Sequence, residues 1–146
     1  MCIRDSSKAL RSLEQRPPAE AEVRDPVLLE NPNDRRIFAV MEALRQGDSV
    51  EEVSRRSTIA PWFVDRIRAL VGVEEALRRG LDDETLISAK RMALSDRRIA
   101  ELAGVSMAAV AEARKRLGLA PTFKCVDTCA AEFAATTPYY LSLIHI

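Results

Sequence analysis

Apolar side chains recur at helical spacing through the middle of the chain. Two stripes stand out, the first formed by Ile37, Val40, Met41 and Leu44 and the second by Phe63, Ile67, Leu70, Val71 and Leu77. Spacings of three and four positions place the members of a stripe on one face of an α-helix. No convincing strand-like alternation occurs between residues 33 and 119. The pattern therefore predicts helices that bury these stripes.

Residues suited to helix ends stand between the stripes. Ser49, with Glu52 three positions later, has the pattern of a capping box, and Pro61 suits a first helical turn. Further helices can begin at Asp82 or Asp83, at Ser95 and at Ser106. Four of the five glycines stand where helices should stop: Gly47, Gly80, Gly104 and Gly118. We expect helices that end near residues 47, 56, 80, 94, 103 and 118.

These elements predict an all-α fold, a compact multi-helix domain of helical hairpins over residues 33–120. Before it, residues 7–14 have the pattern of a helix end. Residues 16–32 hold four of the seven prolines, which predicts an extended linker. After Pro121 the helical pattern stops, and we expect residues 121–140 to form an extended C-terminal segment with a turn of helix from Thr128.

A weak internal repeat runs through the predicted helices. Each of its two units has a short helix, a tight turn and a longer helix. True duplication and the chance similarity of two helical hairpins explain it equally well. Five residues of the first unit are matched at an offset of 46 in the second: Ser49, Val53, Ile59, Val64 and Val71 by Ser95, Ile99, Val105, Val110 and Leu117.

The two ends of the chain can be translated from one DNA element on opposite strands. The codons CTG TCT CTT ATA CAC ATC encode residues 141–146, and their reverse complement encodes residues 1–5, with Ser6 fitting the next codon. The element is similar to a transposon end used in preparing sequencing libraries. We therefore interpret residues 1–6 and 141–146 as adapter translation and expect an internal fragment. This interpretation sets aside Cys2 and the single histidine, His145.

Charge and composition exclude several classes of partner. Lys plus Arg equals Asp plus Glu, at 22 each, so no net field favours nucleic acid or an anionic membrane. No apolar run reaches the roughly 18 residues that a membrane span needs. Only Cys125 and Cys129 remain after trimming, which is no disulfide framework and fits a reducing, cytoplasmic location.

Residues 95–117 have the pattern of a DNA-binding helix-turn-helix. An Ala-Gly-Val-Ser turn separates two predicted helices with apolar packing positions. The first residues of the recognition helix would be Ser106, Met107, Ala108 and Ala109, and they include no Arg, Asn or Gln for base contacts. A DNA-binding regulator is therefore the alternative, and a packing role is favoured.

Candidate chemistry is sparse. Cys125 and Cys129 are too few for a zinc site, and Asp127 and Glu132 lack a histidine, a nucleophile or a glycine-rich loop beside them. We expect no catalytic, cofactor or metal site. Phe63 is assigned to the core, whereas Trp62 is a core residue or an interface anchor. Solvated faces are the simplest expectation for four arginine pairs, which also allow salt-bridged contacts between subunits: Arg35-Arg36, Arg55-Arg56, Arg78-Arg79 and Arg97-Arg98.

One irregular segment carries a family resemblance. It consists of Val126, Asp127, Thr128, Cys129, Ala130, Ala131, Glu132 and Phe133. This run resembles, in all eight letters, the V-D-T-C-A-A-E-F pattern of the carbamoyl phosphate synthetase large subunit, where the helical oligomerisation domain meets the second synthetase half. Residues 61–75 and 49–53 are also similar to that family, with Pro61 replacing a usual arginine. Residues 8–14 resemble the helix that ends its first synthetase half.

The resemblance implies a role for each part of the chain. Residues 7–32 would end the first ATP-grasp half, residues 33–120 would be the oligomerisation domain, and residues 121–140 would lead to the second half. The parent enzyme would use two ATP, with Mg or Mn, to make carbamoyl phosphate from bicarbonate and ammonia for arginine and pyrimidine synthesis. The ammonia would come from glutamine through a glutaminase small subunit. This fragment would be non-catalytic, would self-associate into homo-oligomers, and would bind neither nucleic acid nor membrane.

Overall fold

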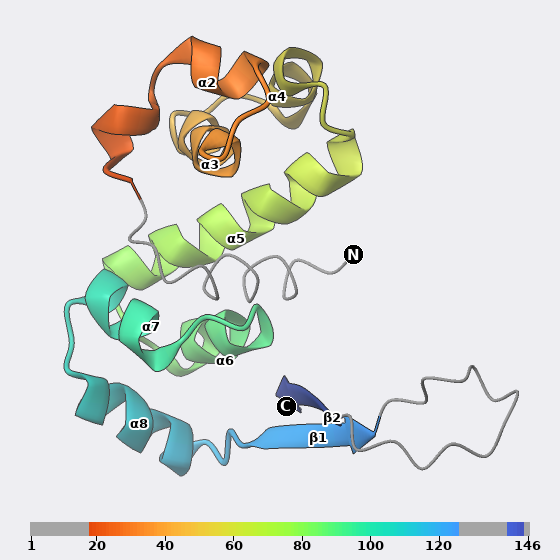
Figure 1. Ribbon diagram of the computed structural model, residues 1–146. Helices are drawn as coiled ribbons and strands as arrows, with labels where there is room; N and C mark the ends of the chain where they lie inside the picture. The colour runs from red at the N-terminus through yellow and green to blue at the C-terminus, as the bar shows by residue number, and fades with distance from the viewer. Residues whose placement is uncertain (1–17, 126–139, 145–146) are drawn as a thin grey trace, which may run out of the picture.

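A computed structural model describes residues 18–125 and 140–144, and it confirms the predicted all-α class (Figure 1). The helices are η1 (Glu20–Val23), α2 (Pro26–Glu30), α3 (Arg36–Arg45), α4 (Val50–Ser57), α5 (Pro61–Arg79), α6 (Asp83–Arg91), α7 (Asp96–Ala103) and α8 (Met107–Arg116). Two strands follow, β1 (Pro121–Cys125) and β2 (Tyr140–Ile144).

The predicted helix caps are confirmed. The hydroxyls of Ser49, Ser95 and Ser106 each accept a hydrogen bond of 3.1 Å from the backbone N–H three residues later, and Asp82 accepts one of 2.7 Å. Each bond satisfies an N–H that has no partner within the helix. The Ser49 capping box forms this half of its pattern, while the carboxylate of Glu52 bonds to Arg55 at 2.6 Å.

Two short helices form within the proline-rich segment, where the sequence suggested only extended chain. Pro26 occupies the first position of α2, and the Asp25 carboxylate accepts a 2.9 Å hydrogen bond from the Val27 N–H. Proline is favourable at this position because its missing N–H would have no helical partner anyway. Val23 and Leu29 from these short helices are buried in the core.

Helix α5 runs between two groups of helices (Figure 1). Helices α3 and α4 pack against it on one side, covered by η1 and α2, and α6 and α7 pack against it on the other. We call residues 36–70 the first unit and residues 83–116 the second unit. Residues 71–79 of α5 connect the two units.

The two units follow the same helix pattern at the predicted offset of 46. Adding 46 to the bounds of α4 gives those of α7, and the first residue of α5 corresponds to that of α8. The turns repeat as well. Left-handed backbone occurs at Gly47 (φ 97°) and its counterpart Ala93 (φ 61°), and again at Thr58 (φ 56°) and Gly104 (φ 65°). Because of Ala93, α6 ends at Arg91 and not at the expected residue 94.

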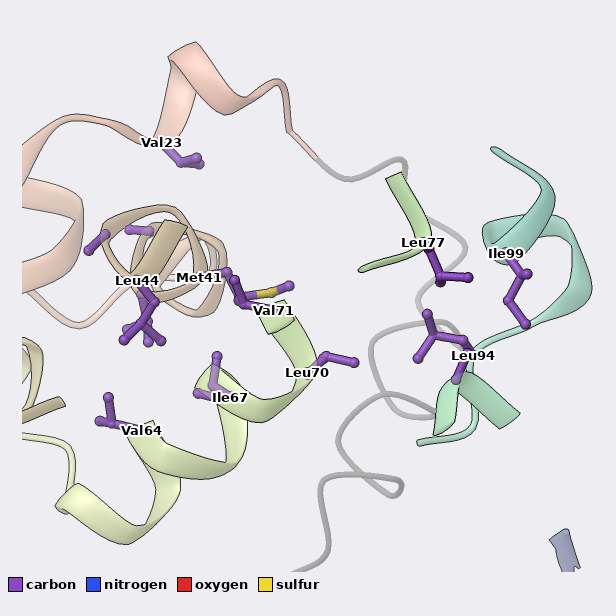
Figure 2. Close-up of a cluster of buried hydrophobic side chains, with 14 of the residues drawn as sticks. Val23, Met41, Leu44, Val64, Ile67, Leu70, Val71, Leu77, Leu94 and Ile99 are labelled. Atoms are coloured by element: carbon purple, nitrogen blue, oxygen red, sulfur yellow. The ribbon is translucent and has the colours of Figure 1, made fainter. Parts of the chain in front are cut away.

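Equivalent apolar positions build the core of both units. Three pairs are fully buried: Val40 with Leu86, Val53 with Ile99, and Val64 with Val110. The buried side chains form one continuous cluster. Figure 2 shows Met41, Leu44, Val64 and Ile67 near one part of α5 and Leu77, Leu94 and Ile99 near its end, with Leu70 between them.

The prediction that Phe63 is a core residue is wrong. Its side chain is 44% exposed, and the neighbouring Val64 occupies the inward position with no exposure. Both residues are apolar and lie 100° apart around the helix, so their spacing to Ile67 fits a buried stripe equally well. Only the position of α3 and α4 against α5 decides which of them is buried.

The described residues after Pro121 are extended, as predicted for the segment that starts there. Strands β1 and β2 pair antiparallel, with Pro121 opposite Ile144 and Cys125 opposite Tyr140. The adapter interpretation of residues 141–146 stays a prediction. The signature segment, residues 126–133, lies outside the described residues.

Candidate functional site

Two aromatic side chains stand exposed at the start of α5. The rings of Trp62 and Phe63 meet edge to face, with centroids 4.9 Å apart and planes at 88°. The guanidinium carbon of Arg66, one helical turn later, lies 5.6 Å from the Trp62 ring centroid, within cation–π range. Trp62 is 53% exposed. We call these three residues the aromatic surface, and their contacts with one another fix its geometry.

An open groove of about 670 Å³ adjoins the aromatic surface. It lies between the end of α3, the start of α4 and the first turns of α5. Asp48, Glu51 and Asp65 line it together with Arg68, which bonds to Asp65 at 2.6 Å. That hydrogen bond, more than any other contact, lowers the pKa of the Asp65 carboxyl. The groove is therefore lined by more acidic than basic side chains.

The second unit shows that the fold does not require aromatic residues at this place. At the offset of 46, Trp62 and Phe63 correspond to Ala108 and Ala109, which are both exposed in the second turn-to-helix junction. The same helix start forms there with alanines. The two rings therefore need another explanation than helix formation or core packing.

A second candidate feature is the inter-unit ion cluster, which we define as Glu42, Arg45, Glu74 and Arg98. Glu74 on α5 is 4% exposed. One of its oxygens accepts a 2.7 Å hydrogen bond from Arg45 of α3, and the other accepts bonds of 3.1 and 2.9 Å from Nε and Nη2 of Arg98 on α7. Glu74 thus joins helices from both units.

Glu42 extends this cluster on the side of the first unit. It is 3% exposed and accepts hydrogen bonds from Arg24 at 3.0 Å and from Gln46 at 3.1 Å. It also forms an ion pair with Arg45 at 3.5 Å. Burial by itself would raise the pKa of the Glu42 carboxyl. The hydrogen bonds and the charges of Arg24 and Arg45 outweigh burial and hold that pKa below its usual value.

The second unit buries one charge of its own. Lys90 is 7% exposed, and its ammonium group donates bonds of 2.9 Å to the Leu94 carbonyl and to Asp96. Arg114 of α8 bonds to the other oxygen of Asp96. This group fixes the α6–α7 turn and joins it to α8.

Sequence reasoning did not find the ion cluster. Arg98 was expected on a solvated face, but its side chain is only 36% exposed and turns toward α5. A usable signal existed, because Glu74 follows Ile67, Leu70 and Val71 at the spacing of the buried stripe. A carboxylate at a core position needs a buried partner.

The helix-turn-helix pattern forms structurally, as α7, a turn at Gly104 and α8. Its exposed leading positions include Met107, at 56% exposure. Arg116 near the end of α8 is paired with Asp83, and Arg114 is paired with Asp96. The DNA-binding alternative gains no support from the comparisons with known proteins reported below.

Neither a metal site nor a membrane span is found in the described part of the chain. Residues 18–125 and 140–144 contain no group of three His, Cys, Asp or Glu side chains that could hold a metal ion. In the same residues, no helix is both long and apolar enough to cross a bilayer.

Comparisons with known proteins agree on one family. A family model described as the carbamoyl-phosphate synthetase large chain, oligomerisation domain, matches residues 4–118. A carbamoyl phosphate synthase large chain from Methanothrix thermoacetophila is 52% identical over 115 residues, which cover 79% of this chain and 11% of that protein. The large chain from Streptomyces avermitilis is 45% identical over 144 residues, which cover 92% of this chain and 13% of that protein.

A third relative is named as one section of a large chain. The carbamoyl phosphate synthase large chain, N-terminal section, from Aquifex aeolicus is 48% identical over 113 residues, which cover 77% of this chain and 20% of that protein. This chain therefore spans only a tenth to a fifth of the length of these three relatives.

Proposed function

The chain belongs to the family of carbamoyl-phosphate synthetase large-chain oligomerisation domains, and we propose that it acts as a non-catalytic connector and self-contact module. The observation that carries the connector role is α5. This one helix packs against α3 and α4 and also against α6 and α7. A continuous helix bound on both sides can hold two flanking bodies at a fixed separation.

The activity of the whole protein follows from the family. We propose that the parent is an ATP-dependent ligase that makes carbamoyl phosphate from bicarbonate and glutamine-derived ammonia in the cytoplasm, with a glutaminase small subunit as its partner. The two ATP molecules, with Mg or Mn, would bind in synthetase halves outside this domain. Residues 7–32 and 121–140 would be the flanks of the domain, and residues 33–120 the domain itself. A relative named as the N-terminal section of a large chain contains the matching segment, which supports placing this domain in the N-terminal part of the parent.

Longer sequence from the same source tests this assignment. We expect ATP-grasp modules before and after the helical domain, together with a complete copy of the signature around residues 126–133. A sensor or regulator domain in either position would overturn the assignment. Residues 1–6 and 141–146 should also be replaced by other sequence if they are adapter translation.

The self-contact is proposed to use the aromatic surface, and its occupant is a second copy of this chain. Three observations support this choice. The rings are exposed and ordered against each other, the repeat shows that the fold does not need them, and the family model describes an oligomerisation domain. Tryptophan and arginine are also the residues that most often dominate binding energy at interfaces.

Sedimentation equilibrium of Trp62→Ala tests this surface. We expect its self-association constant to fall by about tenfold or more, because losing an aromatic anchor costs about 2 kcal/mol. The matched control is Met107→Ala, since Met107 is equally exposed at the equivalent helix start of the second unit. Unchanged association of Trp62→Ala, or equal weakening by both variants, would contradict the proposed surface.

A further inference from the structure

Helix α5 is longer than its counterpart in the second unit. Helix α8 ends at Arg116, and Gly118 follows in a left-handed conformation with φ 66°. At the offset of 46, the counterpart of Gly118 is Gly72, which lies inside α5. The first unit therefore carries a glycine at the place where its repeat stops, yet the helix continues to Arg79. Gly72 is close to the boundary between the first unit and the connecting residues.

Packing against the described part of the chain does not require a glycine at position 72. It is exposed, a Cβ atom added to it would meet no heavy atom within 4 Å, and its φ is not in the left-handed region. Glycine inside a helix costs about 1 kcal/mol relative to alanine. This position is therefore a weak point of α5, placed between the two units.

The buried carboxylate of Glu74 lies only two residues after this weak point. It accepts hydrogen bonds from Arg45 of the first unit and from Arg98 of the second, at distances between 2.7 and 3.1 Å. Charge-assisted bonds to a nearly fully buried carboxylate are stronger than ordinary hydrogen bonds. These bonds hold the segment after Gly72 against both units at once.

The contact of Arg98 with α5 has no equivalent in the first unit. Its counterpart Glu52 pairs within its own helix with Arg55 at 2.6 Å. The second unit has the same pair with opposite charges, Arg98 and Glu101, but these groups are 4.0 Å apart. The guanidinium of Arg98 is drawn instead to Glu74, so the local pair is weakened in favour of the contact with α5.

We propose that Gly72 and Glu74 form a latched hinge between the two units. Glu74 pairs across Gly72 with Arg45 of the first unit and also with Arg98 of the second unit, and these pairs together hold the units in one orientation. Breaking them lets α5 bend at Gly72 while each unit keeps its helices. This inference concerns the chain itself and does not depend on the proposed function. Bistable packing of two rigid bodies about a few backbone positions is a common basis of domain motion.

Distance measurements between two spin labels test the hinge in the full chain. Labels at Arg55→Cys in the first unit and Lys115→Cys in the second report their separation, with the three native cysteines replaced by serine. Labelled chain is diluted with unlabelled chain so that only distances within one molecule are recorded. The latch is broken by Glu74→Gln, which removes the charge that Arg45 and Arg98 both bind, and the control is Glu101→Gln, whose exposed carboxylate pairs with Arg97.

We expect Glu74→Gln to lose the single narrow distance peak and Glu101→Gln to keep it. Adding Gly72→Ala to Glu74→Gln should restore a narrow peak, because alanine stiffens the helix. An unchanged peak in Glu74→Gln would overturn the latch, and a broad peak in the double variant would overturn the hinge at Gly72. Loss of helical circular dichroism in Glu74→Gln would also overturn the proposal, since Glu74 would then hold the fold and not the orientation.

Discussion

The two units share a backbone pattern but differ in which charges they bury. The first unit buries Glu42 where the second has Ser88, and the second buries Lys90 where the first has Leu44. In contrast, the apolar core pairs and the serine caps before α4 and α7 are kept at equivalent positions. Core positions and helix caps specify the shared fold, whereas the differences mark where each unit makes contacts of its own.

The aromatic surface and Glu74 show the same contrast between the two units. The aromatic surface of the first unit corresponds to alanines in the second, and the inward charge of Glu74 lies in the segment of α5 that the second unit lacks. The properties tied to contact and orientation thus lie in the residues that the repeat does not share.

The largest expected effect comes from emptying equivalent core sites. Leu86→Ala should lower the free energy of unfolding by about 3 kcal/mol, and Val40→Ala by less because it removes fewer carbon atoms. Urea unfolding followed by circular dichroism measures both. Because the core is continuous through α5, each variant should unfold in one transition. Two separate transitions would mean that the units fold independently. The control is Val105→Ala at an exposed position, which should lower the free energy of unfolding by less than about 0.5 kcal/mol.

Acid should act on the first unit through Glu42. Its folded-state pKa is lowered, so the folded chain binds fewer protons than the unfolded chain in mildly acidic solution. The stability from this carboxylate is present above the ordinary pKa of 4.5 and is lost as pH falls through the lowered value. We expect Glu42→Gln to cost about 2 kcal/mol at neutral pH, since it removes the buried charge that Arg24 and Arg45 both approach.

Urea unfolding across the pH range checks this prediction. The difference between the original chain and Glu42→Gln should shrink as pH falls from 4.5 through the lowered pKa, because below that pKa both chains carry a neutral group at this position. The control is Glu101→Gln, whose exposed carboxylate should change stability little at any pH. A difference that stays constant down to strong acid would contradict the role of the Glu42 charge.

Local features could be predicted from sequence, and contacts between distant residues could not. Ser49, Ser95 and Gly104 were assigned correctly because caps and helix stops depend on neighbours within four residues. The burial of Phe63 and the exposure of Arg98 were misjudged because each depends on which helix packs alongside. The short helix at Pro26 was missed because proline also marks extended chain, and its Asp25 cap distinguishes the two cases.

The candidate site divides in the same way. Trp62 was recognised as an interface candidate from residue type and helix position alone. The Glu74–Arg98 pair joins residues 24 positions apart in the chain, and no periodicity connects them. The polar residue within the α5 stripe was the one local sign that such a partner must exist.

A smaller effect is expected from removing the serine caps of α4 and α7, and it compares the two units. Ser49→Ala and Ser95→Ala should each cost about 1 kcal/mol, because both remove one hydrogen bond to the third backbone N–H of the helix. Thermal or urea unfolding measures the loss, and Ser49→Asp should keep most of the stability since aspartate also caps. Unequal costs would show that packing around α4 and α7 differs more than their geometry does.

The smallest effect concerns the left-handed turn positions. Ala93→Gly and Thr58→Gly should each raise the free energy of unfolding by about 0.5 kcal/mol, because glycine adopts positive φ without the strain of a Cβ atom. The reverse change, Gly104→Ala, should lower it by a similar amount. Unfolding curves of the three variants compare the units directly, and a loss of stability in Ala93→Gly would contradict the assigned turn.

Because α5 is continuous, the number of its residues sets how the helices at its two ends are rotated relative to each other. Each residue of an α-helix adds 1.5 Å of rise and 100° of rotation. Inserting or deleting one residue between Leu70 and Leu77 would turn everything after α5 by about a quarter of a circle or more, and the Glu74 carboxylate would face away from α7. Loops between the other helices can absorb such changes. The register of α5 is therefore the part of this chain in which natural variation in length should be least tolerated.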